Sequence, residues 1–220
     1  MTTTSELATT AATEPRKRVK LWLAIGGLLF GLILGAVLLL ATGVWRLGPP
    51  QLHGFVMQSP HPVANFTLMG AEGKAVSLRD FRGQVVLLYF GYTYCPDVCP
   101  ATLVELKQAV QALDKDAAEV QMIMVSVDPE RDTPESLQEY VSYFHPSFIG
   151  LTGTESEVLA AATPLGVFFE KSEGTAATGY LIDHTATVLL IDKKGYLRLV
   201  YPFGITGAEI AADLQYIIKN

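Results

Sequence analysis

The sequence contains only two cysteines, Cys95 and Cys99, which lie four positions apart in a chain of 220 residues. A structural disulfide framework uses more cysteines than this and spreads them along the chain to close larger loops. Two thiols so close together favour redox or metal chemistry. The alternative interpretation is one small local disulfide.

The chain also lacks the motifs that would define several other classes of protein. It has no phosphate-binding loop, no dinucleotide fingerprint, no serine-type nucleophile and no internal repeat. It carries 16 Lys and Arg against 22 Asp and Glu; because four of the basic and two of the acidic residues precede an N-terminal apolar segment, the rest has a net charge of −8. An acidic domain does not favour phosphate backbones, so no nucleic-acid partner is expected. The charge favours solubility and attraction to a basic partner.

Charged residues are absent from residues 21–45, which are almost wholly apolar. About 20 apolar residues suffice to cross the hydrocarbon core of a membrane, so this segment can span one with some tilt. A cleavable signal peptide is the competing interpretation, since Ala41-Thr42-Gly43 offers small residues to a protease. The apolar part of such a peptide usually has only 7–15 residues, and we therefore expect a retained transmembrane anchor.

The flanks of the apolar segment predict its orientation. Four basic residues lie between positions 16 and 20, whereas only Arg46 follows closely, so the N-terminus is expected in the cytoplasm and the C-terminal domain outside it. Trp22 and Trp45 are expected near the two membrane interfaces. The first residues include acids and do not resemble a mitochondrial transit peptide, which favours a bacterial source. We therefore expect a single-pass protein of the bacterial inner (plasma) membrane with a periplasmic or extracytoplasmic domain. Its predicted parts are a disordered tail (1–20), an anchor (21–45), a linker (46–62) and a folded domain (63–220).

The folded domain alternates predicted strands and helices. Strands are expected at 65–69, 75–78, 85–90, 120–127, 148–151, 185–191 and 196–201, and helices at 100–113, from 134, from 154 to about 164, and over 208–218. Thr133 before Pro134 predicts a helix start, and Thr154 with Glu157 and Thr206 with Glu209 have the spacing of capping boxes. This order requires a mostly parallel sheet with one antiparallel edge and helices on both faces. The expected fold class is α/β, a thioredoxin-like fold with a central mixed sheet, plus one N-terminal transmembrane helix.

The two cysteines lie in a loop that follows the buried strand 85–90, at the carboxyl edge of the sheet where α/β folds place their sites. Each cysteine precedes a proline, and such residues avoid the right-handed helical region. Pro100 suits the first position of a helix, so Cys99 is expected to be its N-cap. The positive end of the helix dipole there would lower the pKa of a thiol. The two thiolates can form a disulfide or bind a soft metal, for which copper(I) and zinc are the candidates.

A third ligand would decide in favour of a metal, and His184 is the strongest candidate among the four histidines. It lies at the threshold of strand 185–191, whose preceding loop faces the cysteine loop in a thioredoxin-type sheet. The alternative is a partly buried histidine that hydrogen-bonds to backbone. Copper(I) is satisfied by three ligands, whereas structural zinc normally takes four, so the set Cys95, Cys99 and His184 favours copper.

The remaining polar candidates have less support. His145 follows a predicted helix and is expected to pair with its carbonyl groups. His53 and His61 fall in the predicted linker, with Met57 between them, and are either solvated side chains or a weak auxiliary copper site. Asp97 and Asp183 flank the predicted ligands, where they act either as outer-shell carboxylates or as ordinary loop and cap residues.

Four stretches of the chain resemble the Sco/SenC family of copper chaperones. They are YTYCPDVCP (92–100), SVDPERDTP (126–134), GLTGT (150–154) and DHT (183–185), in the order found in that family. The resemblance covers roughly residue 64 to the C-terminus. It implies that Cys95, Cys99 and His184 bind copper(I) or copper(II). It also implies delivery of copper to, or maturation of, the binuclear copper centre in cytochrome c oxidase subunit II. Another periplasmic copper chaperone is a further candidate partner, and the sequence leaves the donor of copper open.

Two functions from different classes remain open at this point. The first is a copper metallochaperone, which binds and hands on the metal without turnover of a substrate. The second is a thiol–disulfide oxidoreductase that uses Cys95 and Cys99 as a redox-active pair to keep the cysteines of subunit II reduced. The spacing of three residues between the cysteines, rather than two, argues against a general oxidoreductase. The 126–134 stretch is interpreted as structural, with a turn at Asp128-Pro129 and a cap at Thr133.

Overall fold

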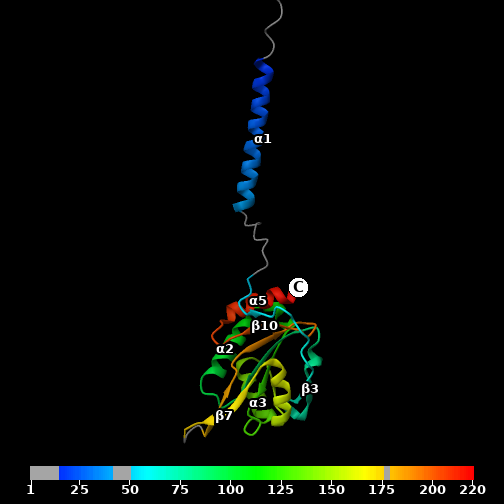
Figure 1. Cartoon of the computed structure of the whole chain (residues 1–220), viewed down its shortest axis with the longest axis vertical. Helices are drawn as coiled ribbons and strands as arrows, with labels where there is room; N and C mark the ends of the chain where they lie inside the picture. The colour runs from blue at the N-terminus through cyan, green and yellow to red at the C-terminus, as the bar shows by residue number, and fades with distance from the viewer. Residues whose placement is uncertain (1–14, 42–50, 176–178) are drawn as a thin grey trace, which may run out of the picture. The chain divides into compact units, whose positions relative to one another are not determined.

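The computed structural model describes residues 15–41, 51–175 and 179–220, in two compact units that correspond to residues 1–50 and 51–220. In the first unit, α1 (Pro15–Ala41) contains a stretch, Val19–Leu40, that is long and apolar enough to cross a membrane (Figure 1). The helix begins six residues before the predicted anchor and so includes part of the predicted tail. Proline is tolerated in a first helical turn, where N–H groups have no partner within the helix. Residues 1–14, Trp45 and the first residues of the predicted linker lie outside the described residues.

The second unit is built on a six-stranded mixed sheet in the order β1-β10-β9-β4-β5-β6. Its strands are β1 (Phe55–Val56), β4 (Val85–Gly91), β5 (Val120–Ser126), β6 (Ile149–Leu151), β9 (Val188–Ile191) and β10 (Leu197–Tyr201). Strands β4, β5 and β6 are parallel, as predicted. The antiparallel part lies at one edge, as expected, but it is larger than predicted, because β9 is antiparallel to both β4 and β10 and β1 is antiparallel to β10. The sheet is therefore less parallel than the sequence indicated. The tight turn at Asp192 reverses the chain between β9 and β10, and it is β9 that pairs with β4.

In the described residues of this unit, four helices and two small hairpins accompany the sheet. The helices are α2 (Val98–Gln111), α3 (Pro134–Phe144), α4 (Glu155–Ala162) and α5 (Gly207–Lys219); the hairpins are β2 (Thr67–Met69) with β3 (Ala75–Ser77), and β7 (Phe169–Glu173) with β8 (Tyr180–His184). Short 3₁₀ turns lie at Ala71–Gly73, Leu78–Phe81, Asp114–Glu119 and Thr163–Leu165. The predicted caps are confirmed, since Thr133, Thr154 and Thr206 each accept a hydrogen bond from a first-turn N–H group.

Strand β4, which leads to the cysteine loop, lies in the buried core. All seven residues of β4 are buried, and β5 beside it is nearly so. Each fully buried large aliphatic side chain contributes about 1.5–3 kcal/mol relative to an exposed one. The end of β4, where the cysteine loop begins, is therefore anchored in the most deeply buried part of the sheet.

Two segments differ from the sequence-based expectation. Residues 55–56, predicted as linker, form β1 on the edge of the sheet beside β10, and the N–H groups of His53 and Gly54 donate to the buried carboxylate of Asp213 on α5. The chain from residue 51 thus belongs to the folded domain. The expected strand at 185–191 begins only at Val188, and His184 instead ends β8 in a hairpin that was not predicted.

The close approach of α2 and α5 depends on Gly207, and the two helices lie side by side in Figure 1. A Cβ atom at position 207 would lie 2.5 Å from the Glu105 carbonyl oxygen and 2.7 Å from Gln108 Cβ. We expect Gly207→Ala to lower the free energy of unfolding by about 1–3 kcal/mol, the usual cost of overpacking. Thermal unfolding followed by circular dichroism checks this, with exposed Ala208→Ser as the control. An unchanged midpoint for Gly207→Ala would show that the two helices can separate without cost.

Candidate metal centre

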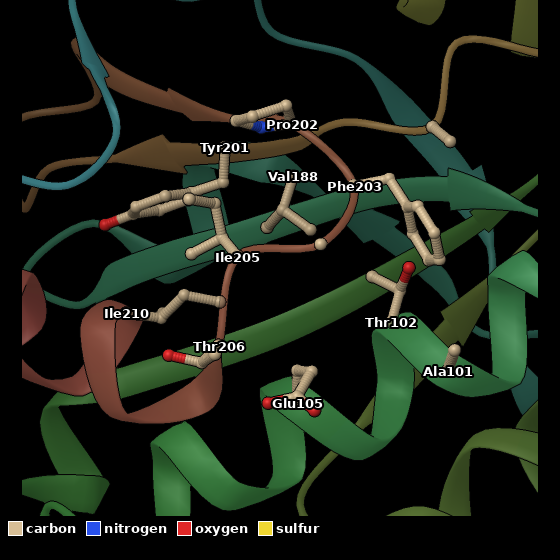
Figure 2. Close-up of a pocket in the computed structure, with 12 residues that line it drawn as sticks. Ala101, Thr102, Glu105, Val188, Tyr201, Pro202, Phe203, Ile205, Thr206 and Ile210 are labelled. Atoms are coloured by element: carbon tan, nitrogen blue, oxygen red, sulfur yellow. The ribbon is translucent and has the colours of Figure 1, made fainter.

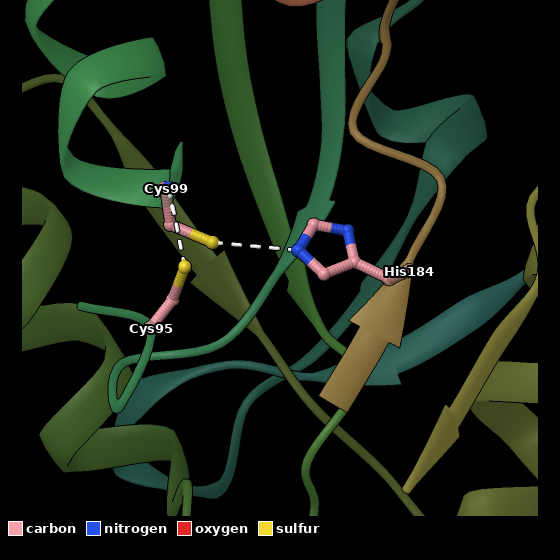
Figure 3. Close-up of side chains that lie close together, drawn as sticks. All are labelled: Cys95, Cys99 and His184. Carbon is pink, nitrogen blue, oxygen red and sulfur yellow. Dashed lines mark hydrogen bonds between the residues drawn. The ribbon is translucent and has the colours of Figure 1, made fainter. Parts of the chain in front are cut away.

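Cys95, Cys99 and His184 meet in space, although 85 positions separate Cys99 from His184. Their ligand atoms all lie within 4.8 Å of one another (Figure 3). Cys99 Sγ is 3.6 Å from His184 Nε2, and the N–H group of Cys99 donates to Cys95 Sγ over 3.3 Å. The structure therefore confirms the predicted convergence of the cysteine loop and the loop that enters β9. Within the described part of the chain, no other group of three or more His, Cys, Asp or Glu side chains has this arrangement.

The start of α2 differs from the prediction in a way that changes the roles of the two sulfurs. Asp97, not Cys99, is the N-cap, and the N–H group of Ala101 closes the first turn on the Asp97 carbonyl. Cys99 is therefore inside the first turn, and the restriction on residues before Pro100 is overcome. The sulfur that accepts a hydrogen bond from the first turn of α2, from the N–H group of Cys99, is that of Cys95. The dipole of α2 thus favours negative charge on Cys95.

The two thiols have opposite environments. Cys99 is fully buried, whereas Cys95 is half-buried. The pKa of Cys95 is lowered to about 4, chiefly by the hydrogen bond from Cys99 and further by His184 and backbone N–H groups, against the opposing effect of burial. The pKa of Cys99 is raised, first by its hydrogen bond with Cys95 and then by burial. In the reduced protein the pair therefore shares one proton, with the thiolate at Cys95.

This difference predicts the pH dependence of alkylation. In the reduced, metal-free protein, iodoacetamide should modify Cys95 and leave buried Cys99 largely unmodified. Because the pKa of Cys95 is lowered, its thiolate persists as pH falls, and the rate should decline only as pH approaches about 4. An ordinary thiol loses roughly 100-fold in rate between pH 8 and pH 6, so free glutathione in the same mixture is the control. Peptide mass spectrometry at each pH gives the profile; an inflection near that of glutathione would contradict the assignment.

Aromatic side chains surround the three residues. The buried hydroxyl of Tyr89 donates to Cys99 Sγ over 3.4 Å, and the rings of Tyr89 and Tyr92 stand edge-on to the His184 ring at centroid distances of 6.2 and 5.9 Å. The Tyr92 hydroxyl accepts from the N–H group of Ile182 on β8, which ties the strand of His184 to the cysteine side. The sequence analysis missed both tyrosines. Their position at the end of a buried strand, just before the cysteines, was the available signal.

Gly91 makes room for the buried sulfur. A Cβ atom at this position would lie 3.0 Å from Cys99 Sγ and 2.8 Å from Tyr89 Cε1. Any larger residue would displace the sulfur or the tyrosine that hydrogen-bonds to it. Glycine at position 91 therefore leaves space for Cys99 Sγ and the Tyr89 ring at the end of β4.

The other candidate residues lie outside this cluster. His53 Nδ1 hydrogen-bonds to the Asp213 carboxylate over 2.8 Å, so this histidine is a structural partner of α5 instead of a solvated linker side chain. His145 bonds to the Ser147 hydroxyl just after α3. Asp97 and Asp183 are exposed near the ligands, and an outer-shell role for them stays a prediction.

A separate pocket of about 140 Å³ lies between α2, the end of β10 and the start of α5 (Figure 2). Its lining is mostly apolar and contains none of the three metal-ligand candidates; it includes Thr102, Val188, Tyr201, Phe203, Ile205 and Ile210. The Glu105 carboxylate, which also lines it, accepts a hydrogen bond from the N–H group of Gly207. The pocket therefore adds no ligand to the Cys–Cys–His cluster.

Comparison with known families agrees with the metal site that the geometry indicates. The sequence model of the SCO1/SenC family matches residues 57–219, which is most of the chain and includes all three candidate ligands. The chain belongs to the SCO1/SenC family. The resemblance noted in the four sequence motifs is thereby confirmed.

Relatives of known structure share the fold of this SCO1/SenC member. Apo Sco1 from Thermus thermophilus is 46% identical with a TM-score of 0.69, over 76% of this chain and 96% of that one. Bradyrhizobium japonicum ScoI, solved with copper bound, is 39% identical with a TM-score of 0.65, over 71% of this chain and 99% of that one. The human mitochondrial SCO2 homologue is 35% identical over 195 residues, 88% of this chain and 73% of that protein. The predicted fold class, a thioredoxin-like domain with a mixed central sheet and one N-terminal apolar helix, is confirmed.

Proposed function

We propose that this chain is a copper metallochaperone that binds one copper ion through Cys95, Cys99 and His184. The observation that carries the proposal is the meeting of two sulfurs and one imidazole nitrogen within 4.8 Å. Thiolates select soft ions, and three ligands satisfy copper(I), whereas closed zinc sites normally have four protein ligands. Two related proteins, from Bradyrhizobium japonicum and Arabidopsis thaliana, were solved with copper bound at 39% and 32% identity to this chain.

The exposure of the ligands suits a protein that passes its metal on. Cys99 is buried, whereas Cys95 and His184 are partly exposed. An incoming thiolate from a partner can therefore replace Cys95 or His184 first, while Cys99 keeps its bond to copper until the last exchange. Copper is the cargo in this scheme, and the protein changes only its ligands.

The recipient proposed here is the binuclear copper centre in subunit II of cytochrome c oxidase, with another extracytoplasmic copper chaperone as donor. Membership of the SCO1/SenC family implies a role in cytochrome oxidase assembly, which supports this recipient. The acidic charge of the domain would attract a basic surface on either partner.

The proposed location is the outer face of a bacterial inner membrane. In this scheme α1 is a retained anchor, residues before it lie in the cytoplasm, and the domain from residue 51 is exported. The basic residues between positions 16 and 20 support this orientation, because positive charge remains on the cytoplasmic side.

A thiol–disulfide reductase is the second candidate, and the lowered pKa of Cys95 favours it. The half-buried Cys95 thiolate can attack a partner disulfide and form a mixed disulfide with it. Cys99 can then attack Cys95, which forms a Cys95–Cys99 disulfide and releases the reduced partner. The test is reduction of oxidised subunit II cysteines by the metal-free protein. Fast reduction of one partner disulfide per chain, with Cys95 and Cys99 oxidised to a disulfide, that His184→Ala retains would favour the reductase, because the bond exchange takes place between sulfur atoms.

The direct test of the chaperone proposal is a copper(I) titration of the reduced full chain in detergent, against a chelator of known affinity. We expect one tightly bound copper ion per chain. Binding no tighter than that of a variant with both cysteines replaced by serine would refute the proposal.

The hydrogen bond from Tyr89 to Cys99 predicts a spectroscopic change. A hydrogen bond lowers the energy of sulfur lone pairs, so its loss in Tyr89→Phe should move the sulfur-to-copper(II) charge-transfer band to longer wavelength. Copper affinity should fall by about 10- to 150-fold at most, because a hydrogen bond to a charged group is worth about 1.5–3 kcal/mol. Visible absorption of the copper(II) form gives the answer, with exposed Tyr143→Phe as control. An unchanged band would show that the hydroxyl does not contact the sulfur.

A further inference from the structure

Arg131 lies beside the metal centre in a partly buried position that copper binding does not by itself explain. Its side chain is 17% exposed and forms an ion pair with Asp128, whose side chain is fully buried. The guanidinium group lies over three tyrosine rings, at 3.7 Å from the centroid of Tyr180, 4.6 Å from that of Tyr94 and 5.8 Å from that of Tyr92. All three distances fall within the range of cation–π attraction.

These tyrosines come from the two halves of the metal centre. Tyr94 directly precedes Cys95 in the cysteine loop, whereas Tyr180 is the first residue of β8, the strand that ends at His184. Arg131 also donates from Nη1 to the Tyr180 carbonyl oxygen over 3.1 Å. One guanidinium group thus contacts both the segment that carries a sulfur ligand and the strand that carries the imidazole.

Two carboxylates of the same stretch complete the connection. The Tyr180 hydroxyl donates to Asp128 over 2.7 Å, so Asp128 holds both Arg131 and β8. The buried carboxylate of Asp132 accepts from the N–H group of Thr93 over 3.0 Å and from its hydroxyl over 2.5 Å, which fixes the start of the cysteine loop. The SVDPERDTP stretch therefore does more than form the turn and cap expected from its sequence.

We infer that Arg131 is a positioning residue, which sets the separation between the cysteine loop and His184 and so preorganises the three copper ligands. The inference rests on the proposed copper-binding function. A guanidinium group is planar and can stack between two rings while it pairs with a carboxylate, whereas a lysine ammonium group cannot. Because Asp128 is buried, its charge needs a partner, which holds the arginine in place.

The experiment compares Arg131→Lys with the matched control Arg198→Lys in the full chain. Arg198 forms a similar ion pair with Asp192, at 3.0 Å, on β10 and its turn. Copper(I) affinity is measured by chelator competition, and amide hydrogen exchange of residues 180–184 is measured in the metal-free protein. We expect Arg131→Lys to weaken copper binding by about 10–100-fold, as for other groups that orient metal ligands, and to speed exchange in β8. Arg198→Lys should change neither quantity.

The possible outcomes separate this inference from the function on which it rests. If wild type binds copper and Arg131→Lys binds it equally tightly with unchanged exchange in β8, the positioning role is wrong and the copper function stands. Equal losses in Arg131→Lys and Arg198→Lys would also overturn it, since they would reflect general stability. If wild type does not bind copper, the proposed function fails, and hydrogen exchange alone decides whether Arg131 orders β8.

A second pair of variants keeps the test decisive if Arg131→Lys does not fold. Tyr180→Leu removes the ring beneath the guanidinium group but leaves the Arg131–Asp128 ion pair, whereas Tyr180→Phe removes only the hydroxyl. We expect Tyr180→Leu to weaken copper binding in the same range as Arg131→Lys and Tyr180→Phe to weaken it less. Wild-type affinity in both variants would overturn the inference.

Discussion

Copper(I) binding should weaken by at least about 100-fold when His184 is replaced by alanine. Outer-shell groups that only orient a metal ligand are worth roughly 10–100-fold in affinity, and His184 is one of the ligands themselves. The position is well suited to this role, because Nε2 faces the sulfurs while Nδ1 lies 3.4 Å from the Thr185 carbonyl oxygen. Donation from Nδ1–H to that oxygen leaves the lone pair of Nε2 for copper. Chelator competition on the reduced full chain gives the affinity.

The control for this prediction is another histidine of the same domain. His145→Ala removes an imidazole that bonds to Ser147 outside the metal centre, and it should bind copper as wild type does. Equal affinities for wild type and His184→Ala would mean that the third ligand comes from elsewhere. In that case His53→Ala tests whether His53 supplies the third ligand. We expect this variant to lower the stability of the fold and leave copper affinity unchanged.

An even larger effect is expected for Cys99→Ser, which should abolish tight copper(I) binding. The hydroxyl group is a hard ligand and a poor one for copper(I), whereas thiolates select this ion. Cys99 is fully buried and lies between Cys95, Tyr89 and His184, so no solvent molecule can take the place of its sulfur. Serine at this position would still accept the Tyr89 hydrogen bond, and the fold should therefore survive. Isothermal titration and circular dichroism separate the loss of metal from any loss of structure.

Two comparisons sharpen this second prediction. Thr102→Ser, one turn further along α2, keeps the hydrogen bond to the Val98 carbonyl and should leave copper binding intact. Oxidation of the wild type to a Cys95–Cys99 disulfide should block copper binding as the serine variant does, and reduction should restore it. Tight binding by Cys99→Ser, with an unchanged absorption spectrum, would mean that Cys99 is not a ligand.

The candidate ligands could be predicted from the sequence because each of them lies beside a strand that the sequence marks clearly. Two cysteines after a buried apolar strand and a histidine before another strand fall at the same edge of an α/β sheet. The strands β4 and β5 and the capped helices were equally clear, since their signals lie in continuous apolar runs and in cap residues. The different roles of Cys95 and Cys99 were harder to predict from the sequence. The first residue of α2 decides which sulfur accepts hydrogen bonds from the N–H groups of its first turn. The prolines alone predicted a helix start two residues too late.

What escaped prediction depends on contacts between distant segments. The β7–β8 hairpin is mostly polar and half exposed, so its strands lack the alternation that marks a buried sheet. Strand β1 has only two residues and exists because β10 offers a free edge. The role of Arg131 is visible only after folding, since Tyr180 lies 49 positions away from it.

X-ray absorption spectroscopy at the copper edge tests the central claim most directly. The full chain loaded with one equivalent of copper(I) should show two sulfur atoms and one imidazole nitrogen around the metal. In His184→Ala the imidazole signal should disappear while both sulfurs remain. Copper without imidazole in the wild type, or imidazole that persists in His184→Ala, would contradict the assignment of Cys95, Cys99 and His184 as the copper site.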